Sequence, residues 1–184
     1  SAYVEQTTIK ANNLEEALSL FDAHAKAHYS VAWIDCLAGG DRLGRSLILL
    51  GEHAKQGSLL LKPKKTVSLP FNLPNFVLNQ YSIKTFNALY YQRIRPVEST
   101  QLVDYQSFFY PLDAINHWNR LYGKDGFCQY QLVLPKKAGL EGMTAILKRI
   151  AKSKRGSFLA VLKMFGKSNE NYLSFPFEGY TLAL

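Results

Sequence analysis

The chain has 184 residues, of which 47% are hydrophobic and 20% are charged. This composition is typical of a folded globular chain, with one domain of ordinary size or two very small ones, and it excludes intrinsic disorder. The 22 basic and 14 acidic residues give a net charge of +8, which favours anionic partners such as a phosphorylated ligand, nucleic acid or an acidic membrane surface.

The first fifty residues predict three strands and one helix. We expect strands at residues 3–11, 29–36 and 45–51, the third returning beside the first. Asn13 caps the helix, with Glu16 three positions on as in a capping box. Lys26 and His28 should lie near its C-terminal end, where positive charge suits the helix dipole.

The rest of the chain mixes helices and strands without strict alternation. We expect a basic turn at 62–65, an irregular connector at 69–75, helices at 76–95, 112–122 and 140–151, strands at 127–134 and 157–165, and extended segments near Leu173 and Tyr180. About seven strands and four helices in this order predict an α+β fold. It is a mainly antiparallel sheet flanked by helices, in a single domain over residues 1–184.

Several classes of site have no support in the sequence. Cys36 and Cys128 form no CxxC pair, and the four histidines show no HExxH or His-x-His spacing, so we expect no metal. No apolar run approaches the ~18–20 residues that span a bilayer, so we expect a soluble chain. The segment Gly39–Ser46 is close to a phosphate-binding loop, but a strand-like run follows it where that loop needs a helix. A glycine-rich hairpin loop is the simpler interpretation.

Two strands carry residues with binding chemistry. Gln129 and Gln131 point to the same face of the strand at 127–134. Two neighbouring amides suit the hydroxyl groups of a sugar. A strand face that is simply exposed to solvent would show the same pattern. Lys163 interrupts the apolar run 158–165, which predicts a strand covered on both sides. A lysine there either pairs with a carboxylate or awaits an anionic ligand.

Aromatic residues and basic clusters give weaker signals. Tyr110, beside a proline, could offer a hydroxyl at a loop edge, and Trp33 could be core or the wall of an apolar pocket. The basic clusters 62–65 and 148–155 have no interleaved aromatics, so the sequence gives no motif for nucleic-acid binding.

Five ordered segments together resemble one family. They are residues 29–45 (YSVAWID…GDRLGR), 108–123, 126–135 (GFCQYQLVLP), 158–166 (FLAVLKMFG) and 173–184. The chain is similar to the substrate-binding domain of flavin-dependent decaprenylphosphoryl-ribose 2-oxidases, in the vanillyl-alcohol-oxidase class of FAD-linked oxidoreductases. The resemblance implies oxidation of the ribose 2-hydroxyl of a polyprenyl-phosphate sugar by hydride transfer to FAD, after which a partner reductase yields the arabinose epimer. It also implies a cytoplasmic protein, either free or held peripherally at the inner membrane.

The resemblance also implies a substrate site. Its residues would be Trp33, Tyr110, Gln129, Gln131, Lys163, Phe165 and Thr181. Thr181 and Ala183 stand where the family has Asn and Cys, so inhibitors that capture that cysteine should not react here. No residue of the chain is expected to be catalytic.

The ends of the chain suggest a fragment. It begins at Ser1 without methionine and stops at Leu184 in an alternating apolar segment. We therefore expect a substrate domain separated from its FAD-binding domain and C-terminal remainder, inactive alone. A sugar-lactone or polyol oxidase of the same class, and a non-enzymatic basic module that binds nucleic acid or protein, remain the alternatives.

Overall fold

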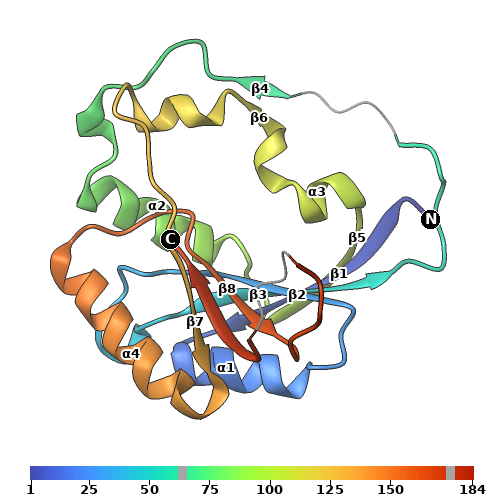
Figure 1. The fold of residues 1–184 in the computed structure, drawn as a ribbon. Helices are drawn as coiled ribbons and strands as arrows, with labels where there is room; N and C mark the ends of the chain where they lie inside the picture. The colour runs from blue at the N-terminus through green and yellow to red at the C-terminus, as the bar shows by residue number, and fades with distance from the viewer. Residues whose placement is uncertain (62–65, 173–176) are drawn as a thin grey trace.

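A seven-stranded antiparallel sheet organises the chain (Figure 1). The computed structural model describes residues 1–61, 66–172 and 177–184. The spatial order of the strands is β5-β1-β3-β2-β8-β9-β7. Their bounds are β1 Tyr3–Ala11, β2 Tyr29–Ile34, β3 Ser46–His53, β5 Glu98–Asp104, β7 Gln131–Pro135, β8 Val161–Phe165 and β9 Gly179–Ala183. This architecture confirms the predicted α+β fold.

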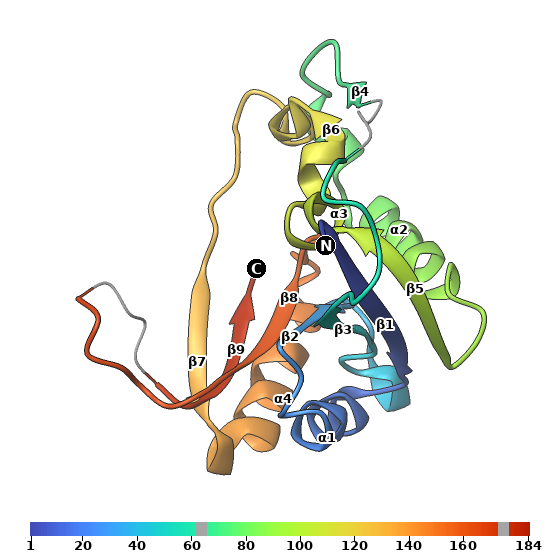
Figure 2. The same cartoon turned by 90° about the vertical axis from the view of Figure 1, so that its right-hand side faces the viewer.

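Helices α1 (Leu14–Ala23) and α4 (Lys136–Ser153) cover one face of the sheet (Figures 1 and 2). Phe21, Met143 and Leu147 from these helices pack against Leu162 and Leu182 of the strands, and all five are almost fully buried. A leucine buried in this way contributes about 1.5–3 kcal/mol. The alternate residues of the same strands therefore point to the opposite face of the sheet.

Helix α2 (Gln80–Gln92) packs on that opposite face. Its Tyr91 forms a second, smaller core with Trp33 of β2 and Leu47 of β3. Residue Asn79 begins the helix with a capping box, since its side chain accepts from the Ser82 amide and its own amide donates to the Ser82 hydroxyl. The second core lies over β2 and β3, away from the β8-β9-β7 end of the sheet.

The remaining elements are short. They are α3 (Tyr105–Phe109), the parallel strand pair β4 (Val67–Ser68) and β6 (Ile115–Asn116), and 3₁₀ turns at Gly40–Arg42, Asn75–Val77, Pro111–Ala114 and Trp118–Tyr122. In Figure 2, β4, β6 and α3 lie at the end of the molecule remote from α1 and α4.

The sequence predicted the first strand and the start of the first helix correctly. Strand β1 has the predicted bounds, and the Asn13 side chain accepts from the Glu16 amide at the start of α1. The predicted end of this helix was wrong. Helix α1 ends at Ala23, so Lys26 and His28 lie beyond its last turn.

The predicted helix at 112–122 was also wrong. This segment forms two 3₁₀ turns with β6 between them, and His117 adopts the left-handed conformation with φ 57°. A left-handed residue cannot continue a right-handed helix, so the apolar spacing here reports surface packing and not a helical face. Helix 76–95 begins four residues later than expected, after a 3₁₀ turn, and ends at Gln92.

The two predicted strands near the candidate site are shorter than expected. β7 begins at Gln131 and not at Phe127, and β8 begins at Val161 and not at Ser157. The predicted basic turn at 62–65 and the extended segment near Leu173 lie outside the described residues.

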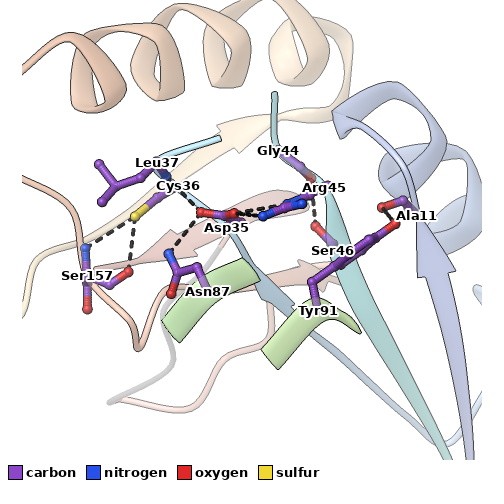
Figure 3. Close-up of polar contacts among 10 residues, drawn as sticks. All are labelled: Ala11, Asp35, Cys36, Leu37, Gly44, Arg45, Ser46, Asn87, Tyr91 and Ser157. Carbon is purple, nitrogen blue, oxygen red and sulfur yellow. Dashed lines mark hydrogen bonds and ion pairs between the residues drawn. The ribbon is translucent and has the colours of Figure 1, made fainter. Parts of the chain in front are cut away.

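A buried polar network fastens the sheet to α2. Figure 3 shows Asp35 between Arg45 and Asn87. Arg45 donates to Asp35 Oδ2 through Nε at 3.0 Å and Nη2 at 2.8 Å, while Asn87 Nδ2 and the Leu37 amide donate to Oδ1. The loop that resembled a phosphate-binding loop therefore joins two antiparallel strands, and its Arg45 is committed to an internal carboxylate.

Candidate substrate-binding site

The candidate site lies on the face of β8, β9 and β7 that points away from α4. Leu162 and Leu182 are fully buried against the helices. Because side chains alternate along a strand, Lys163 and Thr181 point to the opposite face, where they are directly cross-strand. The same alternation places Gln131 there, opposite Ala183.

Five side chains from these strands, and Gln129 just before β7, line a pocket of about 140 Å³; the five are Gln131, Val161, Lys163, Thr181 and Ala183. Complete small-molecule sites are typically about 300–1,000 Å³. The pocket is thus smaller than a complete site, and it presents two amides, one hydroxyl, one ammonium group and two apolar side chains.

A chain of hydrogen bonds crosses the floor of the pocket. Gln131 Nε2 donates to Thr181 Oγ1 at 3.0 Å, and Thr181 Oγ1 donates to the Leu132 carbonyl at 2.8 Å. Thr181 is 1% exposed, whereas Gln131 is exposed. The amide of Gln131 is therefore bonded to the buried Thr181 on one side and open to the pocket on the other.

Lys163 differs from the prediction. The apolar run around it predicted a strand covered on both sides, yet Lys163 is exposed, on the face of β8 opposite to the one that buries Leu162. Within residues 1–61, 66–172 and 177–184 its ammonium group has no hydrogen bond or ion pair. The predicted internal carboxylate partner is therefore not found there, and the charge faces the pocket.

Three of the seven predicted site residues do not line the pocket. Trp33 is buried under α2, packs against Tyr90 with the two rings tilted, and donates from Nε1 to the Phe158 carbonyl. Phe165 is half-buried at the far end of β8. Tyr110 is 55% exposed at the end of α3. The structure thus brings Gln129, Gln131, Lys163 and Thr181 together, and their role in substrate binding stays a prediction.

Two lining residues were not proposed from the sequence as site residues. Val161 and Ala183 are cross-strand partners at the apolar end of the pocket. The two-residue period of a strand could have identified both. Val161 lies two residues before Lys163 and Ala183 lies two residues after Thr181, and positions two apart share a strand face.

The next observations concern metal ions, membrane spans and basic surfaces. The described residues contain no group of three or more His, Cys, Asp and Glu side chains that could hold a metal ion. No helix among them is both long and apolar enough to cross a membrane. The basic residues Lys148, Arg149 and Lys152 line a shallow hollow on the outer surface of α4, on the opposite side of the sheet from the pocket.

Comparison with known proteins finds a curated relative that matches most of the chain. No family model matches the chain. Over 183 residues, it is 32% identical to the decaprenylphosphoryl-β-D-ribose oxidase of Mycolicibacterium smegmatis (strain ATCC 700084 / mc(2)155), and the match covers 94% of the chain. The chain is a homologue of this oxidase. The resemblance inferred from the five sequence segments is therefore confirmed. The chain spans 39% of the length of that relative.

Proposed function

We propose that this chain is the substrate-binding part of an FAD-dependent oxidoreductase. The enzyme would oxidise a sugar CH–OH group, at C2 of the ribose of a polyprenyl-phosphate ribose. The observation that carries the proposal is the similarity over 183 residues to a protein named decaprenylphosphoryl-β-D-ribose oxidase, joined to a pocket lined by two amides and a lysine.

The pocket residues have the chemistry that the substrate requires. Each amide of Gln129 and Gln131 offers both donors and an acceptor, which matches hydroxyl groups. Lys163 offers three donors and a positive charge to a phosphate or to a polarised hydroxyl oxygen. Val161 and Ala183 give the apolar surface against which a ring can lie.

The described residues do not fit a complete FAD. A pocket of about 140 Å³ is smaller than a flavin dinucleotide requires, since sites for drug-sized ligands are already about 300–1,000 Å³. We therefore expect another part of the parent protein to hold the cofactor chiefly, and that part would close the open side of the pocket. In this proposal a partner reductase consumes the oxidised sugar, and the parent works free in the cytoplasm or at the inner membrane.

The test uses the full-length protein with its flavin. A polyprenyl-phosphoryl ribose is added without oxygen, and the visible flavin absorbance is followed. We expect bleaching. Lys163→Gln should raise the half-saturating substrate concentration at least about tenfold, because a hydrogen bond to a charged group is worth about 1.5–3 kcal/mol. Lys167→Gln, which removes the same charge just beyond β8, is the matched control and should bind as the unmodified protein does.

The other outcomes separate the alternatives. A flavin that stays oxidised with this donor but bleaches with a neutral lactone or polyol would replace the substrate and keep the enzyme class. Equal losses on phosphorylated and neutral donors in Lys163→Gln would refute the phosphate role of Lys163. A full-length protein that binds no flavin, with DNA or RNA retention that falls steeply with salt, would favour the nucleic-acid module.

A further inference from the structure

We infer that Thr181 is a positioning residue that fixes which end of the Gln131 amide faces the ligand. The identity of the ligand rests on the proposed function, but the orientation of the Gln131 amide by Thr181 does not depend on it. In this role, Thr181 does not touch the substrate. It holds the amide nitrogen of Gln131 against the sheet, which leaves the amide oxygen as an acceptor for a ligand hydroxyl.

The position of Thr181 makes this role possible. β9 lies between β8 and β7, so Thr181 has Lys163 directly across on one side and Val133 directly across on the other. Gln131 is the diagonal neighbour on β7, within reach of a long side chain. Thr181 is 1% exposed, and its branched Cβ restricts the rotation of the side chain. Its hydroxyl therefore points in a fixed direction.

The hydrogen-bond chain allows one orientation of the amide. The backbone carbonyl of Leu132 can only accept, so the 2.8 Å contact uses the single proton of the Thr181 hydroxyl. Towards Gln131 that hydroxyl oxygen can then only accept. The amide must present Nε2, as it does at 3.0 Å. A flipped amide would place its oxygen against an oxygen that has no proton left to give.

The fixed amide complements Lys163. Across the residues that the structure describes, Gln131 Oε1 and the second Nε2 proton have no partner. Lys163 can only donate, whereas Oε1 can only accept. A sugar hydroxyl does both, so it can give its proton to Gln131 Oε1 and accept from Lys163. Thr181 thereby makes the pocket selective for a hydroxyl over an ether or a deoxy position.

The first test needs no substrate. Side-chain amides of glutamine are labelled with ¹⁵N in the full-length protein, and the two Nε2 protons of Gln131 are followed by NMR. In the unmodified protein we expect one of them to exchange slowly with solvent, because it is bonded to Thr181. Thr181→Val, which keeps the shape and removes the hydroxyl, should make both exchange fast, and Thr181→Ser should restore the protection. Unchanged exchange in Thr181→Val would overturn the inference.

Control variants keep the result interpretable. Thr144→Val makes the same chemical change on α4, across the sheet from the pocket, and should leave the Gln131 signals unchanged. If Thr181→Val does not fold, Thr181→Ala repeats the test with neither γ-methyl group present. Rapid exchange of both Gln131 protons in the unmodified protein would also overturn the inference.

The second test measures ligand selection. With the polyprenyl-phosphoryl ribose, Thr181→Val should raise KM about fivefold to tenfold, the value of one hydrogen bond, with little change in kcat, and Thr181→Ser should behave nearly as the unmodified enzyme does. Gln131→Ala should raise KM in the unmodified enzyme, but it should raise KM little further when Thr181→Val is already present. Full additivity of the two substitutions would overturn the positioning role. If the sugar is not a substrate, the proposed function fails, while the NMR result still decides the role of Thr181.

Discussion

Replacing Arg45 by methionine should destabilise the fold strongly. Arg45 and Asp35 form an ion pair in which the side chains are only 10% and 3% exposed, with two hydrogen bonds to Oδ2. Removing one partner of a buried pair leaves an unpaired buried charge and typically costs about 3–5 kcal/mol. Oδ1 keeps its bonds from Leu37 and Asn87, so we expect a loss near the lower end, about 3 kcal/mol.

Urea denaturation measures this loss. Tryptophan fluorescence is a suitable signal because Trp33 lies in the smaller core beside Leu47 and is 8% exposed. Arg42→Met, at an exposed position of the same loop, is the matched control and should change the free energy of unfolding by less than about 0.5 kcal/mol. The double variant Asp35→Asn/Arg45→Met should recover much of the loss, because no buried charge remains.

Two results would refute this reasoning. If Arg45→Met loses no more than Arg42→Met, then Asp35 is solvated in solution and the pair does not fasten α2 to the sheet. If the double variant is as unstable as Arg45→Met alone, the loss comes from missing packing of the arginine stem and not from an unpaired charge.

Three further predictions concern other parts of the sheet. Burial raises the pKa of the Cys36 thiol to about 11, so at pH 8 a thiol reagent should modify only the exposed Cys128, and two rapidly reacting thiols in the native protein would contradict this. Gly179→Ala should prevent proper pairing of β9, since a Cβ there would lie 2.0 Å from a backbone carbonyl of β7, and a variant with unchanged thermal stability would show that the strands lie further apart. Burial raises the pKa of the Asp22 carboxyl, but hydrogen bonds from Tyr180 and a lysine outweigh this and hold it below its usual value. The Tyr180 bond therefore stabilises the fold above about pH 4, and the stability difference between Tyr180→Phe and the unmodified protein should shrink as acid protonates Asp22; a difference that stays constant from pH 7 to pH 3 would contradict it.

The parts of the fold that depend on local sequence were predictable. β1 alternates roughly and is rich in Thr, Val and Ile, and one of its edges pairs with β3 as expected from the returning strand. The α+β class followed from the order of elements alone. The failure at 112–122 arose from His117, whose left-handed conformation is set by the surrounding chain and leaves no mark in apolar spacing.

The strand face that carries the pocket was predictable in part, but its burial was not. Strand periodicity placed Gln129 and Gln131 together, and the pocket contains both. The environment of Lys163 depends on whether a helix covers the outer face of β8, which is a tertiary property that an apolar run of one strand does not encode. Tyr110 was chosen through family resemblance, and in the described chain it follows the last residue of α3, outside the pocket.

The order in which the strands occur has a consequence for how the pocket forms. β7 and β8 come first along the chain, with α4 between them, but the strand that joins them in space is β9. Neither β7 nor β8 can complete its ladder on this side until β9 has inserted between them. Pairing across such sequence separations is slow because loop closure precedes the stabilising contacts. The pocket is therefore complete only after β9 has paired with both strands, whereas β8 can pair with β2 without it.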